Sequence, residues 1–352
     1  MSKFEGKNLR VEIYGQSHDK KIGAKVKGMP SFSPDMNALF AFLERRKASD
    51  AVFSTERKED DKPEIVGIKD GKLKKDFEVV IKNNDVRSKD YNELYGIPRP
   101  SHADYCWYVK NNVLDFSGGG RFSGRLTAPL VLLGGILKQY LESKGVRIYS
   151  YLSKVGKVSG KSYADGVTED ELKLKREFPA LTNSEEMLAE IARAKADGDS
   201  VGATVECVVK GVKAGFGDDY FSGLEGKISA LVYAIPAVKG VAFGAGFDLA
   251  EMLGSAANDA WRYEDGQVLS LTNNSGGING GISNGMDITF KAAFRPTPSI
   301  SKPQKTVDLI KKENAEITIK GRHDACVAVR ALPAIESAAA IALADEYSEK
   351  EN

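Results

Sequence analysis

The sequence feature that most constrains the fold is an apolar segment at residues 125–143, where leucines recur on nearly every face of a helix. A helix that is apolar all round has to be covered by protein, so we expect this segment to be buried. Its most apolar part, residues 128–137, is too short and too interrupted by glycine to cross a bilayer, and we expect no membrane span. A second helix, rich in alanine, is expected at residues 332–347.

The remaining segments mix helix and strand signals, which indicates an α+β protein in one domain, residues 1–352. Further helices are expected at residues 33–47, 184–196, 223–234 and, as a broken helix, 248–261. Strands are expected at residues 9–14, 65–68, 77–81, 202–212, 238–243, 287–294 and 317–320. Ser33 is the expected cap of the first helix, and Asp70-Gly71 predicts a hairpin. Five glycines within residues 273–285 predict a loop that approaches another part of the molecule closely.

The charge balance excludes a general attraction to nucleic acid or to an anionic membrane. Lysine and arginine number 50 against 49 aspartate and glutamate residues, so any anion site has to come from local clustering. The three cysteines are far apart and form no CxxC pair, which argues against a disulfide framework or a zinc site. Together with the absence of an apolar run at the N-terminus, this predicts a cytoplasmic protein.

The three histidines, His18, His102 and His323, each lie among glycine, proline, serine and arginine residues rather than in an apolar stripe. Histidine has the one side chain whose ordinary pKa allows proton transfer near neutral pH. A single histidine in such a loop would more often satisfy nearby backbone groups, but three of them favour acid–base chemistry. No pair has helical i, i+4 spacing and no acidic cluster surrounds them, so we expect no metal site.

Arginines gather near the same motifs, and a guanidinium group matches carboxylate and phosphate oxygens in a bidentate fork. The arginines concerned are Arg45, Arg46, Arg57, Arg99, Arg121, Arg125, Arg322 and Arg330. Arg121 and Arg125 flank a glycine-rich turn where a helix begins, and a helix N-terminus favours anions. For Arg45 and Arg46 the alternative is a solvated helix end. A dinucleotide fold is excluded because the glycine spacing lacks its third glycine, and no GxxxxGK[ST] run occurs.

Read together, these motifs resemble those of the chorismate synthase family over nearly the whole chain. The segments that carry the resemblance are residues 15–19 (GQSHD), 99–104 (RPSHAD), 119–127 (GGRFSGRLT), 276–285 (GGINGGISNG), 295–307 (RPTPSI, then QKTV) and 321–345, which opens with GRHDAC. The family converts 5-enolpyruvylshikimate 3-phosphate to chorismate, by an anti-1,4-elimination of phosphate and a ring proton that requires reduced FMN. The resemblance implies helices packed between antiparallel sheets, a homotetramer, a small-molecule substrate, and NADPH as a candidate reductant of the flavin.

The resemblance also implies roles for individual residues. His18, beside Ser17, would protonate the departing phosphate, and His102 would protonate or polarise the reduced flavin. Asp324 would help to remove the ring proton, and Ser123 would orient groups around the flavin. The residues expected at the cofactor are Arg121, Phe122, Ser123, Gly280, Arg295, Pro296, Thr297, Pro298, Ser299 and Arg322. The residues expected at the substrate are Arg45, Arg46, Arg121, Arg125 and Arg330.

Several positions depart from the family pattern: Gln16, Asp19, Val52, Phe122, Gly124, Leu126, Arg295 and Ala325. None of them removes a proton-transfer group, but Val52 stands where many members carry a further arginine. Two other functions therefore stay open. One is a flavin-binding relative without lyase activity, and the other is a polyanion-binding module, against which the neutral net charge counts.

Overall fold

The computed structural model describes residues 2–17, 19–47, 63–83, 94–116, 119–319 and 324–349. Two five-stranded antiparallel sheets form its outer layers. The first has the order β1-β2-β3-β5-β4, with bounds Ser2–Glu5, Arg10–Tyr14, Lys21–Lys27, Lys72–Lys82 and Pro63–Lys69. The second has the order β7-β6-β8-β14-β9, with bounds Val158–Ser159, Arg147–Val155, Ala203–Lys210, Ile288–Phe294 and Val238–Phe243.

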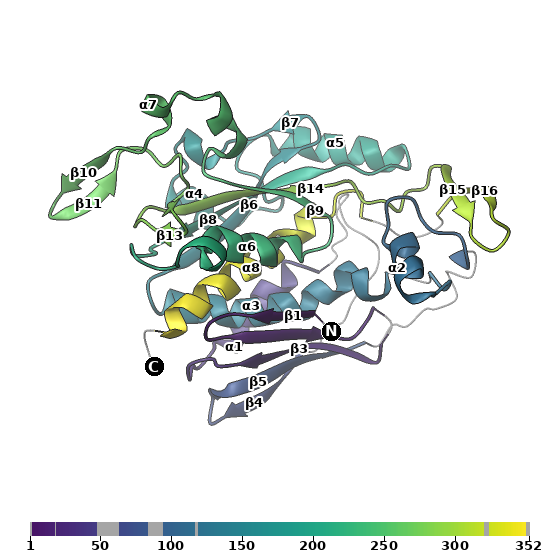
Figure 1. Ribbon diagram of the computed structural model, residues 1–352, viewed down its shortest axis with the longest axis horizontal. Helices are drawn as coiled ribbons and strands as arrows, with labels where there is room; N and C mark the ends of the chain where they lie inside the picture. The colour runs from purple at the N-terminus through teal and green to yellow at the C-terminus, as the bar shows by residue number, and fades with distance from the viewer. Residues whose placement is uncertain are drawn as a thin grey trace.

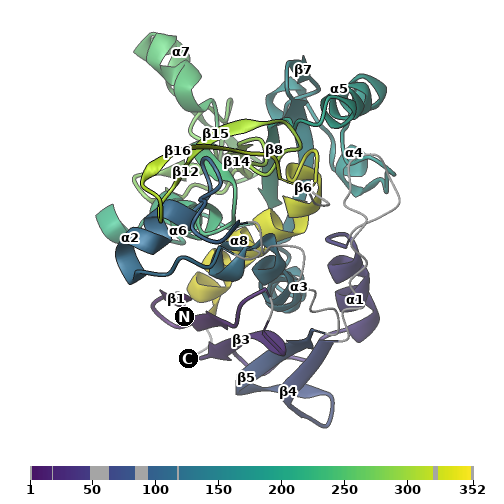
Figure 2. The ribbon, with the colours of Figure 1, turned by 90° about the vertical axis from the view of Figure 1, so that its right-hand side faces the viewer.

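Three long helices lie between these sheets: α3 (Thr127–Glu142), α6 (Leu224–Tyr233) and α8 (Ala328–Glu349) (Figure 1). Helix α1 (Met36–Glu44) packs against α3, and Figure 2 shows the same layers after a quarter turn. The buried apolar residues of both sheets and of these helices form one continuous core. The β-α-β sandwich expected from the sequence is therefore confirmed.

Smaller elements surround the sandwich. The outer helices are α2 (Asp104–Asn111), α4 (Glu169–Lys173), α5 (Ser184–Ala196) and α7 (Gly254–Ala257). The 3-10 turns are η2 (Gly120–Phe122), η3 (Gly124–Leu126), η4 (Tyr163–Asp165), η5 (Tyr220–Ser222) and η6 (Gly246–Glu251). The two-stranded ribbons are β10–β11 (Trp261–Glu264, Gln267–Ser270), β12–β13 (Ile278–Asn279, Ile282–Ser283) and β15–β16 (Gln304–Asp308, Glu313–Ile317).

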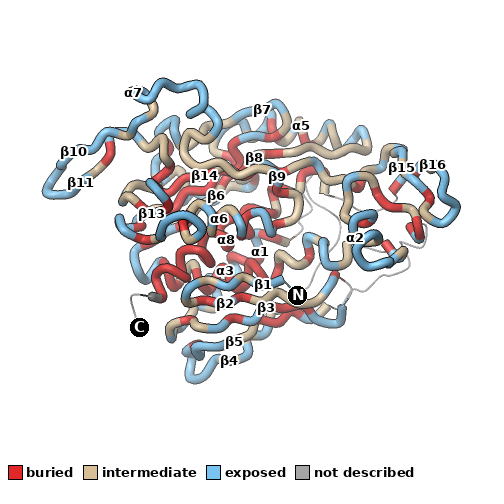
Figure 3. Tube along the Cα trace, viewed as in Figure 1, coloured by how far each residue is buried: buried red, intermediate tan, exposed pale blue. Residues whose placement is uncertain are grey.

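Helices α3 and α8 are the most deeply buried elements of the middle layer (Figure 3). Small side chains let them approach closely. A Cβ placed on Gly134 of α3 would lie 2.1 Å from Cβ and Oγ of Ser337 on α8. Residues 338–344 of α8 are fully buried and consist of alanine, isoleucine and leucine. The two helices expected from the sequence, the apolar α3 and the alanine-rich α8, thus pack against each other.

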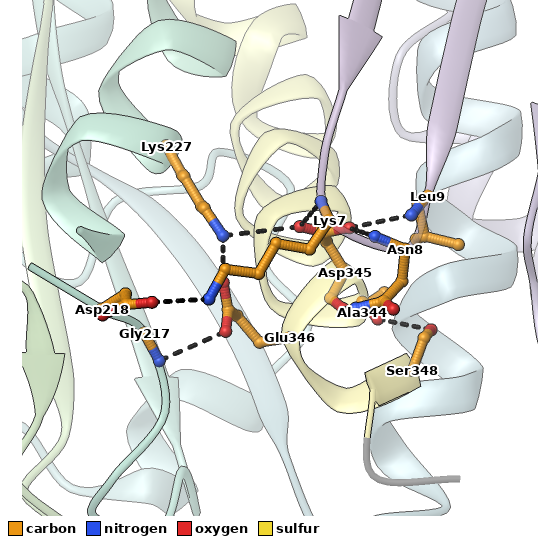
Figure 4. Close-up of polar contacts among 10 residues, drawn as sticks. All are labelled: Lys7, Asn8, Leu9, Gly217, Asp218, Lys227, Ala344, Asp345, Glu346 and Ser348. Atoms are coloured by element: carbon orange, nitrogen blue, oxygen red, sulfur yellow. Dashed lines mark hydrogen bonds and ion pairs between the residues drawn. The ribbon is translucent and has the colours of Figure 1, made fainter. Parts of the chain in front are cut away.

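A polar cluster ties the far end of α8 to its neighbours (Figure 4). The buried carboxylate of Asp345 accepts the backbone amide hydrogens of Lys7, Asn8 and Leu9, at 3.0, 2.8 and 2.8 Å. Lys227 of α6 reaches both Asp345 and the adjacent Glu346. One turn of α8 therefore holds the start of the first sheet and α6 through hydrogen bonds that solvent hardly reaches.

Most expected elements are present, and the hairpin at Asp70-Gly71 is confirmed, with positive φ angles of 50° and 75°. Two expectations were wrong. The first helix is capped by Asp35, not Ser33, because the Asp35 carboxylate accepts the amide hydrogens of residues 37 and 38, and the helix already ends at Glu44. The strand expected at residues 317–320 runs instead over Glu313–Ile317. No helix within the described ranges is long and apolar enough to span a membrane.

The contact between α3 and α8 predicts the effect of adding one methyl group. Gly134→Ala should lower the free energy of unfolding by about 1–3 kcal/mol, because the new Cβ overlaps Ser337. Gly226→Ala is the matched control: it lies in α6, where a Cβ meets nothing within 4 Å, and it should raise that free energy by about 0.5–1 kcal/mol. Chemical denaturation measures both, and equal effects would contradict the packing described.

The Asp345 cluster predicts a second pair of stabilities. Asp345→Ala leaves one buried and two partly buried amide hydrogens without their acceptor and Lys227 without one of its carboxylates, and it should lower the free energy of unfolding by about 3–5 kcal/mol. Asp345→Asn keeps an oxygen for Asn8 and Leu9 and should lower it by only about 1–3 kcal/mol. A loss below about 1 kcal/mol in the alanine variant, read from urea titration, would show that the cluster contributes little.

Candidate active site

A cavity of about 730 Å³ opens between η2, η3, the start of α2, the connection from α6 to β9, and the start of α8. The expected site residues on its wall are Ser17, Arg46, His102, Arg121, Phe122, Ser123, Arg125, Arg295, Thr297, Pro298, Ser299, Asp324 and Arg330. Arg45, Gly280 and Pro296 do not line it. His18, Val52, Arg57, Arg322 and His323 lie outside the described residues.

Backbone and side-chain hydrogen bonds bring these distant segments together. The amide of Ser17 donates to the carbonyl of Gly120 at 3.1 Å, which joins the loop after β2 to η2. The guanidinium of Arg330 donates to the carbonyl of Arg46 at 3.0 Å, which joins α8 to the end of α1. The amide of Arg295 donates to the carbonyl of Ala237 at 3.0 Å. These three hydrogen bonds therefore join six chain segments at the cavity.

Neutral oxygens orient Arg46 and Arg125, two of the three buried arginines on the described cavity wall, while the third, Arg99, pairs with Asp104. Arg46 donates to Oγ1 of Thr127 at 2.8 Å and to the carbonyl of Gly124 at 3.2 Å. Arg125 donates twice to Oδ1 of Asn83, at 3.1 and 2.9 Å. Both side chains are about 95% buried or more, and fixed guanidinium groups of this kind suit planar anions.

Three other cations of the wall, Arg121, Arg295 and Lys239, have no acidic partner in the described part of the chain. Arg121 packs over the ring of Trp107, 5.8 Å from its centroid, and burial lowers the pKa of the Arg295 guanidinium. Lys239, at the start of β9, joins them, although no sequence motif had singled it out. Among the wall residues that the structure describes, seven side chains are cationic and only Asp324 carries a carboxylate. Such a site favours a ligand with several negative charges.

Asp324 is held by Arg330. Two N–H···O contacts from Nη1 of Arg330 reach the two carboxylate oxygens, at 3.2 and 2.9 Å. Both side chains are 15% exposed, so the carboxylate remains accessible from the cavity. The guanidinium thus fixes the orientation of this carboxylate at the cavity wall.

His102 is held in a hydrogen-bonded set with Arg99 and Asp104. Nδ1 of His102 lies 2.5 Å from Oδ1 of Asp104, whose two oxygens also accept from Arg99 at 2.7 and 2.8 Å. Burial alone would raise the pKa of Asp104, but the hydrogen bonds from Arg99 and His102 lower it to about 2. Asp104 is therefore ionised at neutral pH, and its carboxylate lies against the imidazole ring.

Two hydroxyl groups on the cavity wall are buried without a hydrogen-bond partner in the part of the chain described here. They are Oγ of Ser17 and Oγ1 of Thr297. Buried polar groups are normally satisfied, so an unpaired hydroxyl on a cavity wall fits a ligand that supplies the partner. Within the described ranges no three His, Cys, Asp or Glu side chains cluster as metal ligands would.

Sequence reasoning missed one whole wall of the cavity, residues 233–238, which connect α6 to β9. This wall is largely apolar, with Ile235, Pro236 and Val238. These residues carry no charge pattern or motif. Their place at the cavity follows from the position of β9 in the second sheet, which the sequence alone did not reveal. Arg99 was noticed in the sequence, but its pairing with Asp104 was not.

Comparison with known proteins agrees with the fold. The chorismate synthase family matches residues 9–347. The chorismate synthase of Thermococcus kodakarensis is 42% identical over 349 residues, which cover 97% of this chain and 96% of that protein. The chorismate synthase of Methanosarcina acetivorans is 40% identical over 344 residues, covering 97% and 94%.

A solved structure described as "Crystal Structure of Chorismate Synthase" superposes on this chain with a TM-score of 0.75 at 26% identity. The superposition covers 98% of this chain and 93% of that one. The chain therefore belongs to the chorismate synthase family of carbon–oxygen lyases.

Proposed function

We propose that this chain catalyses the FMN-dependent anti-1,4-elimination of phosphate from 5-enolpyruvylshikimate 3-phosphate, giving chorismate. The observation that carries the proposal is the cavity, in which His102 and Asp324 share a wall with seven cationic side chains. The substrate carries a phosphate and two carboxylates, so it needs cations on several sides at once. Family membership indicates which reaction to expect, and the cationic cavity supports the binding of its anionic substrate.

The substrate-binding residues we propose are Arg46, Arg121, Arg125 and Arg330. Arg46 and Arg125 are buried and oriented by neutral oxygens, which suits fixed contacts to phosphate or carboxylate. Arg45 is left out, because its guanidinium donates in a fork to the two carboxylate oxygens of Glu336 at 3.1 and 2.7 Å. Of the two adjacent arginines, Arg45 thus pairs with Glu336, and Arg46 is the one that we assign to the substrate.

The residues present fit a flavin. Residues 235–238 give an apolar wall for a ring system, and Thr297 offers an unpaired hydroxyl. We propose that Arg121, Phe122, Ser123, Arg295, Thr297, Pro298 and Ser299 hold the cofactor, with Gly280, Pro296 and Arg322 added only on the strength of the family resemblance. Reduced FMN, when bound, would supply the electron chemistry that lets the carbon–oxygen bond break without net oxidation.

The chain's own residues would handle the protons. We assign His18, assisted by Ser17, to protonate the leaving phosphate, and general acid catalysis of this kind contributes about 10²–10⁴-fold. His102 would serve the flavin, and Asp324, oriented by Arg330, would take part in removing the ring proton. Ser123 accepts the amide hydrogen of Arg125 at 3.2 Å and would keep η3 and its arginine in place.

Assembly and location are proposals of the same kind. A homotetramer, a cytoplasmic location and action as one domain rest on the family resemblance and, for the last, on the continuous core. NADPH as the reductant is tested by anaerobic turnover with NADPH as sole electron donor, with and without an added flavin reductase. Turnover in both mixtures supports reduction of the flavin by this chain, and turnover only with the added enzyme contradicts it.

The decisive test of the reaction uses purified protein, reduced FMN and 5-enolpyruvylshikimate 3-phosphate under anaerobic conditions. We expect equal amounts of phosphate and chorismate. Flavin binding without turnover would indicate the inactive relative, and tight, salt-sensitive RNA retention on a filter would indicate the polyanion-binding module.

Replacing His18 tests the proton donor. His18→Ala should lower kcat by at least about 100-fold, because the phosphate then leaves without a positioned acid, while the flavin still binds. Flavin titration and steady-state assay of the variant measure the two effects. Loss of flavin affinity together with activity would count against the assigned role.

The two neighbouring arginines give a matched comparison. Arg46→Lys should raise the KM of the substrate about tenfold or more, because lysine cannot reproduce a fork fixed by Thr127 and Gly124. Arg45→Lys should leave KM within about twofold, because Glu336 keeps Lys138 and a cation at position 45. Steady-state kinetics decide, and the reverse ranking would return Arg45 to the substrate site.

A further inference from the structure

His102 reaches the cavity from a tight turn in which the side chains of Arg99 and Asp104 contact its ring. The turn spans residues 99–104 and ends at the first residue of α2. Ser101 adopts the left-handed conformation, with φ of 58°, and the amide of His102 donates to the carbonyl of Arg99 at 3.2 Å. This conformation folds the imidazole back onto Asp104, two residues later.

We propose that Asp104 is a positioning residue for His102, fixing the imidazole as the tautomer with hydrogen on Nδ1, so that Nε2 exchanges the proton with a ligand in the cavity. The functional meaning of this tautomer rests on the flavin-directed role proposed for His102. Asp104 itself is 5% exposed and does not line the cavity. Its effect on a ligand therefore has to pass through the ring.

The contact with Asp104 assigns the tautomer. Nη2 of Arg99 lies 2.8 Å from Oδ1 of Asp104, and it lies equally far, at 3.2 Å, from the carbonyl of Phe116 and from Nδ1 of His102. The shorter contact between the imidazole and Asp104 therefore decides where the ring hydrogen lies. An ionised carboxylate can only accept. The 2.5 Å contact between Nδ1 and Oδ1 therefore requires a hydrogen on Nδ1.

Arg99 keeps the carboxylate from turning away. Its backbone amide and Nε both donate to Oδ2, at 3.0 and 2.7 Å, and the side chains of the pair are 4% and 5% exposed. The other charged side chains of the cavity wall come from other elements, among them Arg121, Lys239, Arg295 and Asp324. In the described part of the chain, none of them hydrogen-bonds the imidazole, so Asp104 and Arg99 alone set its tautomer.

Asp104→Asn should reverse the tautomer. The amide oxygen best replaces Oδ2, where two Arg99 donors meet, and this places the NH₂ group beside Nδ1. The NH₂ group then donates to Nδ1, and the imidazole proton moves to Nε2. We expect kcat to fall about 10- to 100-fold, with the substrate KM and the flavin Kd within about twofold of wild type.

Nitrogen-15 NMR of histidine-labelled protein tests the tautomer without flavin or substrate. The chain has only three histidines, and His102→Ala identifies the signals of interest. At a pH where the ring is neutral, we expect hydrogen on Nδ1 in the wild type and on Nε2 in Asp104→Asn. Asp248→Asn, an exposed residue of η6, is the control and should match the wild type in spectrum and kinetics.

A wild-type ring with hydrogen on Nε2 overturns the proposal, as does an Asp104→Asn variant with unchanged tautomer and kcat. If Asp104→Asn does not fold, as judged by near-ultraviolet circular dichroism, the wild-type spectrum alone still supports or overturns it. Hydrogen on Nδ1 in a protein that does not turn over 5-enolpyruvylshikimate 3-phosphate supports the positioning by Asp104 and refutes the proposed reaction. The two failures are therefore distinguishable.

Discussion

The contact between α3 and α8 is the constraint on which both the fold and the cavity depend. Gly134 and the alanines after Ser337 let the two helices meet at a distance that larger side chains would forbid. Both helices begin at the cavity: Arg125 and Thr127 lie where α3 starts, and Arg330 and Ala331 lie in the first turn of α8. The packing of the core thus sets the spacing of the arginines, and two helix N-termini add partial positive charge to the same place.

A nearly neutral chain produces a strongly cationic cavity because its buried acidic side chains are neutralised elsewhere. Glu336, less than two turns beyond Arg330 on α8, is enclosed by Arg45 and Lys138; burial would raise its pKa, but these two cations lower it to about 2. At the far end of α8, Asp345 and Glu346 are paired with Lys227. Helix α8 therefore holds three buried carboxylates that are paired with cations outside the cavity. Asp324 is then the acidic side chain on the described cavity wall.

The sequence predicted the parts of this protein whose signals are local. The hairpin at Asp70-Gly71 needs two residues that accept positive φ, and this residue pair predicted it. The amphipathic pattern of residues 184–196 predicted α5, which begins and ends at those residues. The ribbons β10–β11 and β15–β16 were missed because their strands are short and largely polar. Charge and motif likewise indicated the arginines and His102, whereas the division of work between Arg45 and Arg46 depends on which way the chain turns at the end of α1.

Backbone conformation, which no composition reveals, completes the cavity. Ser101 and Ala237 both line it, and both adopt positive φ angles, 58° and 73°, that residues with a Cβ rarely hold. Such strain costs about 1–3 kcal/mol and persists only where the surroundings over-determine it. At Ser101 the surroundings are the hydrogen bonds of Arg99, His102 and Asp104, and at Ala237 the carbonyl accepts the amide hydrogen of Arg295. Stability is thus given up at two points of the cavity wall, where the chain holds the imidazole of His102 and the backbone of Arg295 in fixed positions before any ligand arrives.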